Sequence, residues 1–331
     1  MSIKPKIKKI NEYNRVPDTS ITNEYPTSKN SLTTPFLMLV VGGRNTGKSY
    51  TTAKILQQSK LDKTYDRYFM ITSSYQSNKK YWDFLDMNEE DIFLPSHDSV
   101  DRVIEQLEFE AEDWNDYILE KELYDKFVEQ TKNAESLTAI SEYDLQLYQD
   151  AGFINNEGDL SEFEPPKWKY EMERPAQTIC IFDDILGSAA LANSKGLTKM
   201  AIMNRHIAPL SEPYKNRSAV GCACIFLTQQ YSGGGGGAQG GIPRGLRLNA
   251  THLVFFENKS SDVMKKILEE LNGAIDEEEF MMAYDYAIKE KHDNIMVDMH
   301  PKCPKKRYRR NLSQFIVYPS QETECICHLK K

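Results

Sequence analysis

The sequence predicts an α/β fold with a mainly parallel central sheet and helices on both of its faces. Five short apolar runs, each the length of one buried strand, are separated by segments with helical patterns. An acidic segment after the second run is also far longer than a simple crossover requires. The runs are FLMLVV (36 to 41), RYFMIT (67 to 72), TICIFD (178 to 183), CACIFLT (222 to 228) and HLVFF (252 to 256).

The chain divides by composition into four parts. Residues 1 to 34 are rich in Lys, Asn, Pro, Ser and Thr, and we expect a flexible basic arm there. One large domain should follow over residues 35 to 331, with a helical insertion at 83 to 165 and a basic C-terminal extension at 295 to 331. The segment SGGGGGAQGGIPRG, residues 232 to 245, predicts a mobile loop, because glycine loses too much backbone entropy in regular structure.

Charge is unevenly distributed along the chain. The net charge is -8, yet residues 83 to 164 alone hold 25 Asp and Glu against four Lys and Arg. Residues 1 to 15 carry a net charge of +4 and residues 300 to 331 carry +6. These basic residues could contact a polyanion or could simply be solvated, and the sequence leaves both interpretations open. No apolar run approaches the ~20 residues of a membrane span, and the N-terminus lacks a signal peptide's apolar centre. We therefore expect no membrane insertion, no secretion and reduced cysteines.

The segment GGRNTGKS, from Gly42 to Ser49, matches the pattern G-x-x-x-x-G-K-[ST]. It directly follows an apolar run and precedes the helix-compatible YTTAKILQQ, which is the context a phosphate-binding loop requires. Backbone N–H groups would face phosphate oxygens, Lys48 would reach the β and γ phosphates, and Ser49 would ligate Mg²⁺. The residues expected to bind ATP are Gly42, Gly43, Arg44, Asn45, Thr46, Gly47, Lys48, Ser49 and Tyr50.

Polar residues end two further apolar runs. Asp183 is placed to hold Mg²⁺ and Asp184 to polarise the attacking water, although either could be an ordinary strand-end cap. Gln229 follows the fourth run, where it could orient water or report loss of the γ phosphate. These positions predict ATP hydrolysis, with Lys48, Asp184 and Gln229 as catalytic residues and Ser49 and Asp183 as the metal ligands.

Four segments in this order resemble one family: GGRNTGKS, TICIFDD, IFLTQQY and IPRGLRLNATHLVFF. The sequence is similar to the genome-packaging ATPases of large eukaryotic double-stranded DNA viruses, the poxvirus-type branch of the FtsK/HerA superfamily. The resemblance implies an ASCE/RecA-like P-loop NTPase that acts as a homo-oligomeric ring and moves double-stranded DNA, irrespective of sequence, into a capsid. It also implies a capsid vertex protein as a partner, and the host cytoplasm or the virion as location.

The resemblance extends to individual residues. It makes Gly42 to Ser49 the nucleotide loop, Asp183 the metal residue, Asp184 the base and Gln229 the sensor. Cellular members usually carry Glu at the position of Asp184, which weakens that assignment. Ring ATPases generally complete the site with an arginine from the next subunit. The candidates for this arginine are Arg205, Arg217 and Arg247.

Contacts with DNA and metal follow less directly from the sequence. Arg244, the N-terminal lysines and residues 302 to 310 are the expected phosphate contacts. Whether Cys303 and the Cys and His residues near it bind metal is left open, since their spacing lacks paired C-x-x-C knuckles. Two rival functions also stay open: a P-loop nucleotide kinase, and a nucleotide-dependent switch or scaffold that recruits partners through the acidic insertion.

Overall fold

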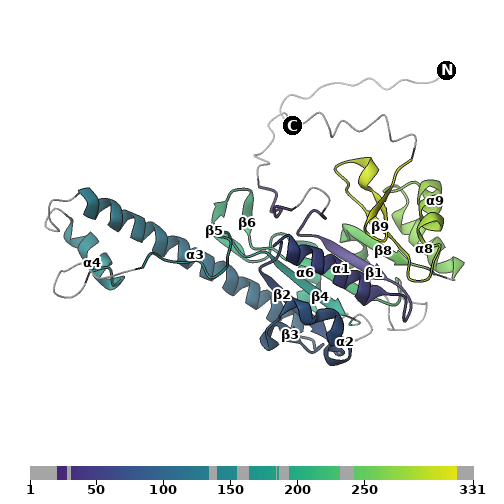
Figure 1. Ribbon diagram of the computed structural model, residues 1–331, viewed down its shortest axis with the longest axis horizontal. Helices are drawn as coiled ribbons and strands as arrows, with labels where there is room; N and C mark the ends of the chain where they lie inside the picture. Colours follow the sequence, from purple (N-terminus) through teal and green to yellow (C-terminus); the bar gives the residue numbers. More distant parts are fainter. Residues whose placement is uncertain are drawn as a thin grey trace, which may run out of the picture.

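The computed structural model contains one large sheet, flanked by helices, from which a long helix projects (Figure 1). Within the described residues the sheet has nine strands in the order β11-β10-β9-β8-β1-β7-β4-β2-β3. The structure describes residues 21–27, 31–133, 140–154, 164–183, 185, 194–231, 242–258 and 260–318.

The five predicted strands form the parallel centre of this sheet. They are β1 (Leu37–Val41), β2 (Arg67–Thr72), β4 (Thr178–Asp183), β7 (Ala223–Thr228) and β8 (His252–Phe256). All five are almost completely buried, which is why each is a continuous apolar run rather than an alternating one. The predicted α/β fold class is confirmed.

Both faces of the sheet are covered, as predicted. Along β1, Leu39 contributes to the core on one face and Val40 to the core on the other, because successive side chains of a strand alternate. The Leu39 face packs against α6 (Lys195–Met203), α7 (Arg244–Asn249), α8 (Ser261–Leu271) and α9 (Glu277–Ala287). The Val40 face packs against α1 (Lys48–Leu61) and α2 (Tyr75–Trp82).

The insertion is built on α3 (Ser99–Asn133), a helix of 35 residues that projects from the body with α4 (Glu142–Asp150) at its far end (Figure 1). At 1.5 Å per residue, α3 is about 50 Å long. Its near part packs into the main core, while the far part and α4 form a separate small core around Phe127, Tyr148 and Phe153. The helical insertion starts at Ser99 rather than 83, since the short turns η1 (Asp83–Leu85) and η2 (Glu89–Asp91) and the edge strand β3 (Ile92–Phe93) belong to the body.

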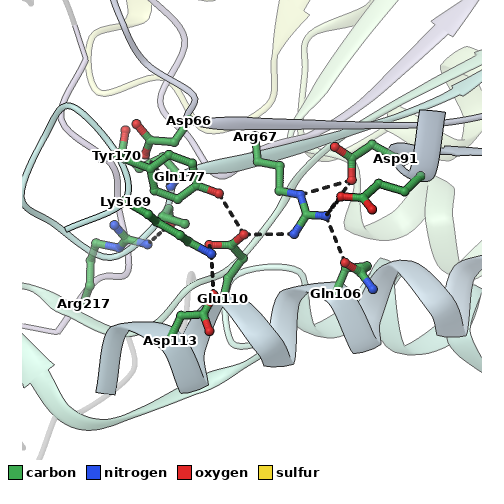
Figure 2. A network of polar contacts seen from close by, with 12 residues as sticks. Asp66, Arg67, Asp91, Gln106, Glu110, Asp113, Lys169, Tyr170, Gln177 and Arg217 are labelled. Atoms are coloured by element: carbon green, nitrogen blue, oxygen red, sulfur yellow. Dashed lines mark hydrogen bonds and ion pairs between the residues drawn. The ribbon is translucent and has the colours of Figure 1, made fainter. Parts of the chain in front are cut away.

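A polar network fastens the base of α3 to the start of β2 (Figure 2). The Arg67 guanidinium donates to Asp91 Oδ1 at 2.7 Å and to Glu110 Oε1 at 2.9 Å. Tyr170 Oη also donates to Glu110 Oε1 at 2.8 Å, and Lys169 Nζ lies 2.9 Å from the second oxygen of Glu110. Burial raises the pKa of the Asp91 carboxyl, and the bonded Arg67 opposes that effect. The network lies at the amino end of the parallel strands.

Two terminal segments are more integrated than the sequence indicates. The expected C-terminal extension supplies the antiparallel strands β9 (Asn294–Asp298), β10 (Tyr308–Arg310) and β11 (Gln314–Ile316), with β9 paired to β8. Part of the expected flexible arm is packed as well, because Tyr25 is buried and donates to the carbonyl of Val220 at 2.7 Å.

Two smaller features complete the fold. The strands β5 (Pro209–Tyr214) and β6 (Arg217–Ala219) pair with each other in a separate two-stranded sheet, and η4 (Pro304–Lys306) precedes β10. Among the described helices, none combines the length and apolar character needed to cross a bilayer.

Candidate active site

The loop between β1 and α1 has a backbone that requires glycine at two positions. A Cβ at Gly42 would lie 2.5 Å from Thr46 Oγ1 and 2.9 Å from Phe256 Cδ2, so a side chain there would clash with the loop and with β8. Gly47 caps α1 with φ +105°, a left-handed conformation that glycine adopts at no steric cost. Thr46 Oγ1 donates to the carbonyl of Gly43 at 2.9 Å and closes the turn. The motif glycines are thus explained by the local geometry.

Positive charge is concentrated at the start of α1. The Lys48 ammonium lies over the loop and donates to the carbonyls of Gly42 at 2.8 Å and Gly43 at 3.0 Å. No acidic residue occupies the first turn of α1, so the helix dipole and the lysine act together on this spot. The arrangement fits a bound anion with several phosphate oxygens.

The carboxyl ends of three neighbouring strands bring the predicted site residues to one edge of the sheet. β7 lies between β1 and β4, with Val41 in register with Thr228 and Asp183 in register with Leu227. The backbone N–H of Gly42 donates to the carbonyl of Thr228 at 3.1 Å, which ties the phosphate loop directly to the end of β7. The loop from Gly42 to Ser49 thus meets the ends of β4 and β7 at one edge of a parallel sheet. Because β7 lies between β1 and β4, Gln229 at its carboxyl end lies next to the ends of both strands.

Asp183 ends β4 as a buried carboxylate with polar neighbours. Ser74 Oγ and Asn78 Nδ2 each lie 3.5 Å from Asp183 Oδ2. Neither residue was predicted from the sequence, although both follow the second apolar run closely and Thr72 is in register with Asp183. The register of β2 and β4 was the missing information.

Two other predicted residues have different outcomes. Gln229 is exposed directly after β7, at the same edge as the loop and Asp183. Asp184, the predicted base, lies outside the described residues.

Arg217, one of the three candidates for an arginine from the next subunit, is buried and bonded within its own chain. The residue is 2% exposed, and its guanidinium donates to the carbonyls of Pro175, Ala176 and Val220, each at 2.8 Å. It also stacks over the Tyr25 ring at 4.6 Å, and burial lowers the pKa of the Arg217 guanidinium. These contacts lie at the amino end of β4, opposite the loop from Gly42 to Ser49.

The other two arginines differ in how far they are engaged. Arg247 makes a two-pronged ion pair with Glu270, 2.7 Å at each oxygen, and packs on the Tyr231 ring. Its side chain is therefore committed within the chain. Arg205 is half-buried and precedes β5, near the amino ends of the parallel strands. Of the two, Arg247 reaches toward the carboxyl edge, since Tyr231 lies three residues after the end of β7.

The expected DNA contacts are partly used inside the protein. Lys302 pairs with Glu24 at 2.8 Å, Arg310 pairs with Asp293 at 2.7 Å, and Arg309 is buried. Arg244 is the first residue of α7, so it belongs to a helix and not to the mobile loop predicted for residues 232 to 245. Residues 232 to 241 of the glycine-rich segment lie outside the described residues.

The cysteines correct one expectation. Cys303 is disulfide-bonded, so the prediction that all six cysteines are reduced is wrong at this position, and its thiolate is not available to a metal. Cys180, Cys222 and Cys224 are buried free thiols within the core. Among the described residues, no group of three or more Cys, His, Asp or Glu side chains could hold a metal ion.

Neither a protein-family model nor a curated protein matches this chain. Among solved structures it is similar to the genome packaging NTPase B204 from Sulfolobus turreted icosahedral virus 2 in complex with AMPPCP, at 10% identity and a TM-score of 0.43, over 83% of this chain and 97% of that one. It is also similar to the pCW3 conjugation coupling protein TcpA with ATPγS, at 13% identity and a TM-score of 0.39, over 87% of this chain and 67% of that one. With TM-scores below 0.5, these likenesses assign neither a family nor an activity to the chain.

Proposed function

We propose that this chain is an ATPase whose site is the edge formed by the loop from Gly42 to Ser49, Asp183 and Gln229. The observation that supports the proposal most is the position of β7 between β1, which precedes the loop, and β4, which ends in Asp183. Phosphate transfer needs a cradle for the phosphates, a carboxylate for the metal and a polar group between them, and this edge supplies all three.

The donor set at this edge fits Mg²⁺ and a triphosphate. The Ser49 hydroxyl and the Asp183 carboxylate would hold the ion, which would neutralise charge on the β and γ phosphates. The loop keeps its conformation only with glycine at position 42, because a Cβ there would clash with Thr46 and Phe256. We assign Lys48 to the β and γ phosphates, Asp184 to polarising water, Gln229 to sensing the γ phosphate, and exposed Tyr50 to the outer side of the pocket.

We further propose that hydrolysis drives translocation of double-stranded DNA by a ring of identical subunits. The support is the motif resemblance, above all the strand that ends in Thr228-Gln229 and the downstream segment IPRGLRLNATH. Arg205 is the proposed trans arginine, since Arg217 and Arg247 are bonded within their own chain. We propose that Arg244 and the basic segments at the chain ends contact DNA. We also propose that the protein docks on a capsid vertex protein, in the virion or the host cytoplasm.

The steady-state ATPase rate with and without duplex DNA tests this function against its rivals. A motor should be stimulated several-fold by DNA of any sequence, and the stimulation should disappear as salt is raised, because phosphate contacts release counterions. Stimulation by a nucleoside would instead indicate a nucleotide kinase. Slow hydrolysis indifferent to both would indicate a switch or scaffold and would overturn the motor.

A further inference from the structure

The turn between α9 and β9 lies against the phosphate loop. A Cβ built on Gly47 would be 3.5 Å from His292 Cβ and 3.7 Å from His292 Nδ1, so the imidazole lies directly beside the glycine that starts α1. The His292 side chain is exposed, unlike the strand that follows it. No sequence motif marks this residue, because it is about 240 positions away from the loop in the chain.

The backbone of His292 is held in an unusual conformation by its neighbours. Its φ is 74°, in the left-handed region that a non-glycine residue enters at a cost of about 1 kcal/mol or more. The adjacent Asp293 fixes the turn: its carboxylate accepts from the Glu290 N–H at 3.1 Å, from Asn311 Nδ2 at 2.6 Å and from Arg310 at 2.7 Å.

The same turn is tied to the phosphate-binding helix. Asn294 is buried and its amide donates to Thr51 Oγ1 at 3.3 Å, one turn into α1. The strained histidine is therefore placed rigidly next to the loop by two elements, β9 and α1. Strain that the surroundings hold in place is typical of functional positions.

The strand order gives the direction in which a bound nucleotide would run. β1 has β7 and then β4 on one side, and β8 and then β9 on the other. The γ phosphate must approach Asp183 at the end of β4, so the nucleoside leaves the loop toward β8 and β9. His292 immediately precedes β9, on that side.

We propose that His292 contacts the nucleoside end of the bound nucleotide, with its imidazole packed against the sugar or the base. The inference rests on the proposed nucleotide-binding function and adds one contact residue, His292, to that site. Because an aromatic ring packs on any base, the contact should strengthen ATP and GTP alike rather than select between them.

Equilibrium binding of ATP and of inorganic tripolyphosphate, each with Mg²⁺, tests the inference. Two variants are compared with the wild type, H292A and H292G, of which the glycine variant suits the left-handed backbone and so preserves the turn. His300→Ala is the matched control, since it removes an exposed histidine just beyond the opposite end of the same strand.

We expect both His292 variants to bind ATP about fivefold more weakly or worse, with tripolyphosphate affinity unchanged. H300A should behave as the wild type. Unchanged ATP affinity in H292G, or an equal loss for ATP and tripolyphosphate, overturns the nucleoside contact. If wild-type protein binds neither ligand, the proposed nucleotide site itself is wrong, so the two failures are distinct.

Discussion

The two edges of the parallel sheet both carry charged side chains but use them differently. At the amino edge, Arg67, Glu110 and Arg217 are bonded several times over within the chain. At the carboxyl edge, Lys48 donates to the carbonyls of Gly42 and Gly43, and Gln229 is exposed. The presence of an arginine or an aspartate therefore does not mark a site. The edges differ in burial: Glu110 and Arg217 are buried, whereas Lys48 is half-buried and Gln229 is exposed.

Burial explains why the amino edge is structural. Desolvation raises the pKa of Asp66 and lowers the pKa of Arg217, which means that both groups lie away from water and depend on their partners. Removing a partner at this edge should destabilise the fold, whereas removing a group at the other edge should affect binding or catalysis. Four predictions test this contrast.

Lys48→Ala should have the largest effect, at the carboxyl edge. Loss of the charged bonds to the phosphates should weaken ATP binding more than about a hundredfold, or at least about 3 kcal/mol. Isothermal titration with ATP measures it, and the urea midpoint should stay near the wild-type value. Tight ATP binding by this variant would place the nucleotide elsewhere on the molecule.

Asp183→Asn should separate hydrolysis from binding. Without the carboxylate, the metal loses one anionic ligand, so we expect kcat to fall by about a hundredfold while ATP still binds. The control is Asp91→Asn at the amino edge, which should lower stability and leave kcat of the folded protein unchanged. If the two variants gave the same pattern, the two edges would not differ in function.

The sequence predicted the carboxyl edge better than the rest of the molecule. Strands β1, β2, β4, β7 and β8 are recognisable because a doubly covered strand is uniformly apolar. Strands β9 to β11 were missed, since short antiparallel strands carry weaker patterns and two of them are basic or exposed. Nothing local to Arg217 reveals its three carbonyl acceptors, which come from segments distant in the chain or from a turn. His292 was missed for the same reason.

Arg217→Ala should destabilise the protein without changing the nucleotide site. The substitution leaves the carbonyls of Pro175, Ala176 and Val220 without their donor, partly offset by removal of a buried charge, so we expect a loss of about 2 to 3 kcal/mol in unfolding free energy. Urea unfolding measures it. A normal urea midpoint combined with lost hydrolysis in assembled rings would instead restore Arg217 as a trans arginine.

His252, at the amino end of β8, should make stability depend on pH. It is 3% exposed, and burial lowers its pKa to about 4 despite Asp298 Oδ2 at 3.8 Å from Nε2. Because the unfolded chain takes up the proton near pH 6.5 and the folded chain only near pH 4, unfolding is favoured as pH falls through this window. Between pH 7 and pH 5 the wild type should lose about 2 kcal/mol more unfolding free energy than His252→Gln, as measured by urea titration. If the wild type and His252→Gln lost the same unfolding free energy, the folded protein would accommodate a protonated His252. The amino edge would then tolerate an additional buried charge, contrary to what the bonded Arg217 and Glu110 indicate.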